Sequence, residues 1–206
     1  MQATEYGYAN NRYHHLERET LGYARVTETH LDTGNGDAVI RTIVREYRND
    51  SLFEKGLIIA ERLQGPDGAP FVETKNTWDF VDANNQQPVA LDQDASGLAL
   101  LNRTVFPRLV GTEQTWFEDN SPARSTGWAF EHDHLGNVVR VRDFGESISE
   151  DDMLISITYS DCENSSWVNL PASYQVIEVE SGSVLRRRRA EQLCANNSPT
   201  ALWEEY

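Results

Sequence analysis

The stretch Trp128–Phe144, WAFEHDHLGNVVRVRDF, decides the fold class of this chain. Its first six residues, and its last seven from Val138 onward, have the aromatic, β-branched and polar mixture that is typical of strands. Between them lies His134–Asn137, HLGN, in which Gly136 can take the positive φ that closes a tight turn. Asp133 can accept hydrogen bonds from backbone amides across that turn. The stretch therefore predicts a β-hairpin.

Further hairpins are predicted on both sides of this one. Residues Tyr23–Leu31, YARVTETHL, alternate with period two, and so do Tyr174–Val179. Turn signals recur between strands of about eight to ten residues, a spacing that favours an all-β fold. The other turns are expected at 32–37, at GPDGAP (Gly65–Pro70), in a loop through Asn120 and Pro122, and at Ser181-Gly182.

Two segments also have helical character. Residues 50–63 place Leu52, Phe53 and Ile59 at roughly helical spacing, but Gly56 interrupts them and the Ile-Ile pair favours a strand. Residues 184–193, VLRRRRAEQL, contain good helix formers, yet they follow a natural hairpin turn. Strand is the prediction for both, with helix as the alternative. Polar residues 82–97 are interpreted as a loop inserted between hairpins.

Composition excludes several classes of function. The 206 residues include 33 acidic and 18 basic ones, which gives a net charge of −15. A nucleic-acid-binding surface and docking on anionic lipid both need clusters of basic residues, so neither is expected. No apolar run approaches the roughly 18 residues of a membrane-spanning helix, and no export signal is visible. The 10% of aromatic residues indicates a folded chain.

The hairpin Trp128–Phe144 resembles the YD repeat of the RHS-repeat family. In that repeat an aromatic, a spacer, a second aromatic and Asp precede a turn with Gly and Asn, and an alternating strand follows. Phe130, Asp133, Gly136 and Asn137 match this pattern and form the structural turn motif, while His132 stands where the second aromatic usually falls.

Other stretches resemble the shells of toxin-complex B components, in the same order and spacing. The matching positions are Gly22, Tyr23, Arg25 and Val26, then Lys55-Gly56, and later Leu170-Pro171. The resemblance implies successive long antiparallel β-hairpins that form a strip of RHS/YD-repeat shell wall. In that family such a strip encloses a toxic C-terminal domain. The implied partners are the remainder of the shell or another toxin-complex component, and the enclosed cargo.

The chain is accordingly interpreted as a single β-rich segment over 1–206. Its expected parts are a lead-in (1–22), first hairpins (23–81), an inserted loop region (82–103) and YD-like hairpins (104–206). A strip of this kind exposes unpaired strand edges, so the isolated chain is expected to be a fragment or small subunit that associates with further β structure.

Candidate ligand sites are sparse in the sequence. His132 and His134 would lie on one face of a strand, but a zinc site needs further ligands at a definable spacing, and none is visible. The pair His14-His15 is interpreted as packing. The stretch 32–37, DTGNGD, lacks the oxygen spacing of an EF-hand and is interpreted as a turn. No metal, cofactor or catalytic residue is therefore predicted.

Charged runs are interpreted as structural or solvated. The acidic runs are Glu150–Asp152, Asp92-Asp94 and Glu204-Glu205, and a glycosidase would need two carboxyls held across a sugar. For the basic run Arg186–Arg189, cross-strand pairing is expected with Glu178, Glu180 and Glu191, in preference to an anion site.

Modification sites depend on the compartment. Asn49, Asn102, Asn164 and Asn196 begin N-glycosylation triplets, which matter only on a eukaryotic secretory path. Cys162 and Cys194 can form one bridge in an exported protein, although two reduced thiols are favoured.

Three functions remain in order of preference. The first is a structural, non-catalytic segment of a secreted or cell-surface bacterial toxin shell. The second is an extracellular carbohydrate- or protein-binding β module, in which Trp78, Trp116 and Trp167 form the contact. The third is a hydrolase with paired carboxylates.

Overall fold

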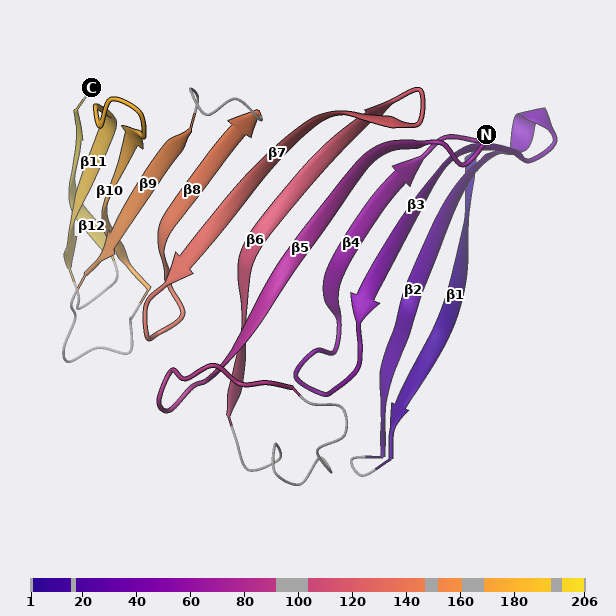
Figure 1. Ribbon diagram of the computed structural model, residues 1–206, viewed down its shortest axis with the longest axis horizontal. Coiled ribbons are helices and arrows are strands. Elements are labelled where there is room, and N and C mark those ends of the chain that lie inside the picture. The colour runs from indigo at the N-terminus through magenta and orange to yellow at the C-terminus, as the bar shows by residue number, and fades with distance from the viewer. Residues whose placement is uncertain are drawn as a thin grey trace. The chain divides into compact units, whose positions relative to one another are not determined.

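A computed structural model of the chain describes residues 2–15, 18–91, 104–146, 152–160, 169–193 and 198–205. It is an all-β structure in which the order of strands in the sheet follows the order in the chain (Figure 1). The strands are β1 (Gln2–His14), β2 (Glu19–Asp32), β3 (Ala38–Arg48), β4 (Leu57–Gln64), β5 (Pro70–Asp82), β6 (Val105–Glu118), β7 (Ser121–His132), β8 (Val138–Glu146), β9 (Met153–Tyr159), β10 (Pro171–Glu178), β11 (Val184–Leu193) and β12 (Ser198–Glu205). The prediction of successive antiparallel hairpins is thereby confirmed.

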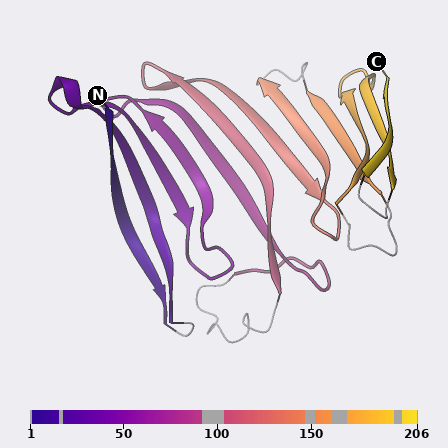
Figure 2. The same cartoon turned by 180° about the vertical axis from the view of Figure 1, so that it is seen from behind.

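The chain divides into two compact units, Met1–Ser125 and Thr126–Tyr206. In the first unit β1 to β6 pair antiparallel, each with the next strand along the chain. Within the described residues of this unit, no helix covers either face of the sheet, as the two opposite views show (Figures 1 and 2). A single layer of strands buries few apolar side chains. Among the described residues of this unit, the buried apolar ones are Leu21, Leu31, Val44, Phe80, Val81 and Val89.

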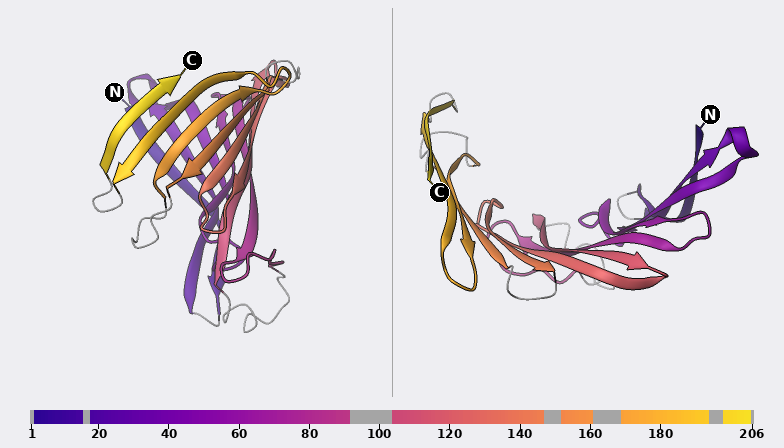
Figure 3. Two further views of the ribbon diagram at one scale, coloured as in Figure 1. Left: turned by 90° about the vertical axis from the view of Figure 1, so that its left-hand side faces the viewer. Right: turned by 90° about the horizontal axis from the view of Figure 1, so that it is seen from above.

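The second unit begins within β7 and continues through β12. Its strands also pair antiparallel with their sequence neighbours, from β7–β8 through β11–β12. The orange and yellow strands in the left view of Figure 3 show these successive hairpins. Leu170, directly before β10, is buried at 7% exposure.

Two hairpin turns show how local sequence sets the register. At GPDGAP the amide of Gly65 donates to the carbonyl of Ala69 over 2.8 Å, and Gly68 has a φ of 82°. Between β6 and β7, Asp119 and Asn120 have φ values of 49° and 63°. Positive φ at both central residues is the geometry of a two-residue hairpin turn whose twist matches that of the strands.

This second turn corrects one detail of the sequence interpretation. The loop was expected to run through Asn120 and Pro122, but Pro122 lies in β7. Because the two-residue turn ends at Asn120, the strand begins at Ser121, and a proline is tolerated near the start of a strand.

The strand prediction is confirmed for 184–193 and for the part of 50–63 that begins at Leu57, whereas residues 50–56 form the turn before β4. Leu57–Gln64 pairs with β3 on one side and β5 on the other, and Val184–Leu193 pairs with β10 and β12. Because each of these strands has a neighbour on both sides, its backbone N–H and C=O groups find hydrogen-bond partners in the sheet. This pairing outweighs a weak helical propensity. The lead-in residues form β1 and the beginning of β2. The sequence analysis did not predict β1.

Candidate functional site

The turn motif between β7 and β8 is built around the carboxylate of Asp133. Its Oδ1 accepts hydrogen bonds from the amides of Leu135 and Asn137, each over 2.9 Å, and its Oδ2 accepts one from Nδ2 of Asn137 over 2.9 Å. The amide of Asp133 in turn donates to the carbonyl of Asn137, also over 2.9 Å. Gly136 has a φ of 88°, in the left-handed region that disfavours residues with a Cβ. The structure therefore brings Asp133, Gly136 and Asn137 together in one turn.

Phe130 lies outside this hydrogen-bonded turn. It is half-buried in β7 and lies opposite Val141 of β8. A residue that the sequence analysis did not name completes the motif, because the Tyr159 hydroxyl donates to the carbonyl of Val138 over 2.9 Å. This bond joins the end of β9 to the first residue of β8.

The turn perturbs the ionisation of two groups. Burial raises the pKa of Asp133, but the hydrogen bonds from Asn137 and Leu135 lower it by more. The pKa therefore lies below its ordinary value. Burial raises the pKa of Tyr159, and the negative charge of Asp133 adds to the increase. Both directions favour an ionised Asp133 beside a neutral Tyr159, which is the state that this hydrogen-bond network requires.

A second structural centre lies at the turn between β3 and β4. Asn49 is 3% exposed, and its Nδ2 donates to the carbonyl of Tyr23 over 2.8 Å while its Oδ1 accepts from the amide of Gly56 over 2.7 Å. Both ends of this amide are therefore used inside the fold. The glycosylation triplet at Asn49 is a structural element here, whereas Asn102, Asn164 and Asn196 lie outside the described residues.

Two buried carboxylates of the first unit form ion pairs with nearby basic side chains. Glu54 is 2% exposed and forms an ion pair with Arg48, whose guanidinium lies over the ring of Phe80. Glu73 in β5 is paired with Arg62 of β4 and with Lys75. Burial raises the pKa of Glu73, but these two cations lower it more, so the net shift is downward. The sequence analysis missed both carboxylates, since their burial has no local signal.

The acidic runs have partners that the sequence did not show. Asp152 was expected in a solvated loop, but it is 6% exposed and accepts a hydrogen bond from Arg142 over 2.9 Å. The strands place Asp152 directly before β9, next to Arg142 of β8, and this pairing explains its burial. Asp92, Asp94, Glu150 and Asp151 lie outside the described residues.

The basic run of β11 pairs with different carboxylates from those predicted. Arg186 and Arg188 both contact Glu204, with Nε–Oε1 distances of 2.7 and 2.8 Å, and Arg187 lies 3.5 Å from Glu205. These partners belong to β12, which lies beside β11. Glu178 instead accepts a hydrogen bond from Ser181, and the side chain of Glu191 lies outside the described part of the chain. The type of interaction was therefore predicted, and the described partners Glu204 and Glu205 are ones that the sequence analysis did not name for these arginines.

The histidines and the stretch 32–37, considered above as candidate ligand sites, lie in strands and turns. His132 ends β7 and His134 is exposed in the turn, while the ring of His15 contacts Tyr13 edge-on at 5.4 Å. Asp32 caps a short 3₁₀ turn, Thr33–Asn35, by accepting from the amide of Gly34 over 3.0 Å. Among the residues that the structure describes, no three His, Cys, Asp or Glu side chains gather where they suit a metal ion. Cys162 and Cys194 lie outside those residues.

The predicted contact tryptophans are engaged within the sheet. The indole of Trp78 donates to the carbonyl of Ile58 over 2.9 Å, and the guanidinium of Arg124 lies 4.1 Å from the ring centroid of Trp116. Trp167 lies outside the described residues. A different tryptophan, Trp203 of β12, is 50% exposed.

Comparisons with known proteins give likenesses of fold. No protein-family model matches the chain, and no curated protein matches it. Two solved toxin-complex structures are similar to it. The structure of TcdB2-TccC3 with Cdc42 has a TM-score of 0.67 and 12% identity, and the match covers 96% of this chain and 14% of that chain. The structure of TcdB2-TccC3 without its hypervariable C-terminal region has a TM-score of 0.68 and 12% identity, and the match covers 97% of this chain and 14% of that chain. A Photorhabdus luminescens Tc holotoxin pore is similar over 96% of this chain and 14% of that one, with a TM-score of 0.68 and 11% identity.

These identities show a shared fold alone. The chain spans about 14% of the length of the toxin-complex chains that it resembles. In the described part of the chain, no helix combines the length and the apolar composition that crossing a lipid bilayer requires.

Proposed function

We propose that this chain is a structural, non-catalytic length of RHS/YD-repeat shell wall that encloses the toxic C-terminal cargo of a secreted or cell-surface bacterial toxin. The observation that carries the proposal is the strand order, in which each strand pairs antiparallel with its neighbour in the chain. Such a strip extends by adding hairpins, and each hairpin buries one edge of the last. The fold likeness to toxin-complex chains over 96–97% of this chain supports the same assignment.

A non-catalytic role is supported by the ion pairs of the buried carboxylates. The described carboxylates that are most deeply buried, Glu54, Glu73 and Asp152, are each paired with an arginine. A general acid needs a carboxyl whose pKa is raised, whereas the pKa values of Glu73 and Asp133 are lowered. These groups therefore stabilise the wall.

Protection from proteolysis tests enclosure. The polypeptide that the native gene encodes, together with any component that co-purifies with it, is digested briefly with proteinase K. We expect the cargo segment to survive while the same segment expressed alone is degraded. A variant with Gly136→Val and Asp133→Ala, which disrupts the turn between β7 and β8, should increase the cleavage of the cargo. A cargo cut equally fast inside and outside the assembly, or an assembly without any cargo segment, would contradict the proposal.

A further inference from the structure

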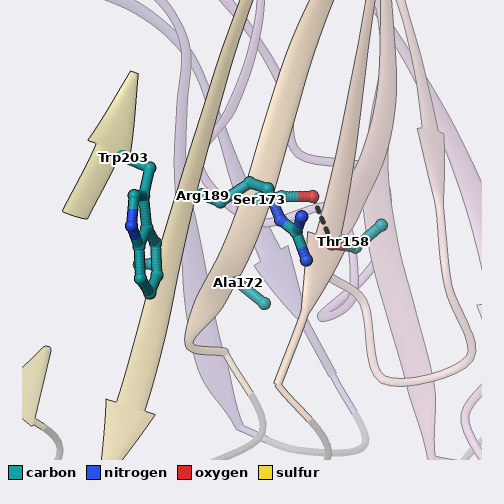
Figure 4. Close-up of a pocket in the computed structure, with 6 residues that line it drawn as sticks. Thr158, Ala172, Ser173, Arg189 and Trp203 are labelled. Atoms are coloured by element: carbon teal, nitrogen blue, oxygen red, sulfur yellow. Dashed lines mark hydrogen bonds between the residues drawn. The ribbon is translucent and has the colours of Figure 1, made fainter. Parts of the chain in front are cut away.

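The last four strands of the second unit carry a row of four side chains in register. Thr158 of β9 lies opposite Ser173 of β10, Ser173 lies opposite Arg189 of β11, and Arg189 lies opposite Trp203 of β12. Residues directly opposite one another in an antiparallel sheet point to the same face. Figure 4 shows the four side chains following one another across the strands.

The row lines an open groove of about 470 Å³, together with Ala172 and Ala190. This volume lies within the range of about 300–1,000 Å³ that is typical of small-molecule sites. The groove is therefore large enough for a small ligand, and too small for the extended contact of a stable protein interface.

The row combines an exposed aromatic ring with two hydroxyl groups. Trp203 is 50% exposed, so a broad face of its indole is accessible to solvent. The hydroxyls of Thr158 and Ser173 lie 2.7 Å apart, and either can donate or accept towards a ligand while bonding the other.

Arg189 differs from the other arginines of its run. Arg186, Arg187 and Arg188 each contact a glutamate of β12. Among the side chains that the structure describes, no carboxylate pairs with Arg189. A guanidinium that lines a groove without a carboxylate partner is suited to bind a planar carboxylate through two parallel hydrogen bonds.

We infer that this groove binds an acidic saccharide, with the sugar ring stacked on Trp203, its hydroxyls bonded to Ser173 and Thr158, and its carboxylate bound by Arg189. The ligand needs an apolar ring face, several hydroxyls and one negative charge, and a hexuronic acid has all three. A polyanion is disfavoured because the chain has a net charge of −15 and Arg189 is the one cation among the described residues that line the groove. The inference stands on these four residues and does not depend on the proposed shell function.

Titration with digalacturonic acid tests the inference, and neutral galactobiose is the comparison ligand. Binding is followed by calorimetry and by the indole N–H resonance of Trp203, which the Trp203→Phe variant assigns. We expect the acidic disaccharide to bind more tightly than the neutral one and to shift that resonance. Trp203→Ala and Arg189→Gln should each weaken the binding about tenfold.

Two matched variants separate the groove from general effects on β12 and on charge. Leu202→Ala changes the neighbouring residue of the same strand, which is 76% exposed, and Arg140→Gln removes an exposed arginine of β8 that pairs with Glu131. Both should bind within twofold of the unchanged chain. The inference is overturned if neither sugar binds, if both bind equally, or if an acidic hexapeptide replaces the saccharide with the same dependence on Arg189. None of these outcomes alters the proteolysis result that tests the shell proposal.

Discussion

At the scale of single residues, Gly136 is the position where the backbone limits the choice of side chain most clearly. Its φ of 88° places it in a conformation that costs an L-residue about 1–2 kcal/mol. Gly136→Val should therefore lower the free energy of unfolding by about 1–2 kcal/mol, whereas Gly136→Asn should cost less because asparagine tolerates this region. Urea denaturation of both variants measures the difference. Equal stability of the valine and asparagine variants would contradict the role of this conformation.

Asp133 makes the same turn sensitive to pH. Its pKa is lower in the folded chain than its ordinary value, so it stabilises the fold above the ordinary pKa of about 4, and this contribution is lost as the pH falls through the lower, folded value. Asp133→Asn keeps an oxygen for the two backbone amides but loses the charge. The variant should be about 1 kcal/mol less stable at pH 6, and the difference should vanish towards pH 2. Urea midpoints across this range provide the measurement, and a difference that stayed constant with pH would refute the prediction.

At the scale of elements, Asn49 joins the turn after β3 to β2 and to the beginning of β4. Asn49→Ala leaves the Tyr23 carbonyl and the Gly56 amide without their partner in a buried site. We expect a loss of about 2 kcal/mol in the free energy of unfolding. Asn85→Ala is the matched control, because Asn85 makes a similar bond to the amide of Gln87 in an exposed loop. That variant should lose less than about 0.5 kcal/mol, and equal losses would show that burial does not decide the effect.

The attachment of β12 depends on a carboxylate shared by two arginines. Glu204→Gln removes the charge that Arg186 and Arg188 contact, so the amides of β12 should exchange with solvent about twofold to fivefold faster. Glu205→Gln affects the single, longer contact with Arg187 and should change these rates less. Hydrogen–deuterium exchange of β10 provides an internal reference. Unchanged exchange in β12 of the Glu204 variant would mean that the pairing of the backbone alone holds this strand.

At the scale of the whole molecule, the sheet order leaves β1 and β12 as its outermost strands. An outer strand offers unpaired backbone groups to other chains, and a lysine on it opposes such pairing. The isolated chain should therefore associate as its concentration rises, and Tyr6→Lys in β1, where Tyr6 is 56% exposed, should reduce this association. Leu135→Lys adds the same charge at a turn position that is 50% exposed, and it should leave the association unchanged.

Static light scattering across a concentration series measures the association. A constant mass of 23.4 kDa at every concentration would contradict the role of the outer strands. An equal effect of the two lysines would assign the association to net charge rather than to β1.

Features that depend on a few adjacent residues could be derived from the sequence by itself. The alternation of side chains predicted strands, and glycine, asparagine and aspartate predicted where the chain turns, because φ preferences and short side-chain bonds act within about four residues. The turn at Asp133 and Gly136, the GPDGAP turn and the all-β class all belong to this group. Even the choice of strand over helix for 184–193 followed from the neighbouring turn.

The partners of individual side chains were decided by the tertiary structure alone. Glu204 lies 18 residues from Arg186, and Asn49 lies 26 residues from Tyr23, so no local pattern distinguishes these pairs from other combinations of the same residue types. The register of neighbouring strands selects them. It also places Thr158, Ser173, Arg189 and Trp203 in one row, although 45 residues separate the first from the last. A sheet brings such residues together only when every intervening hairpin has formed, because each strand takes its register from the strand before it.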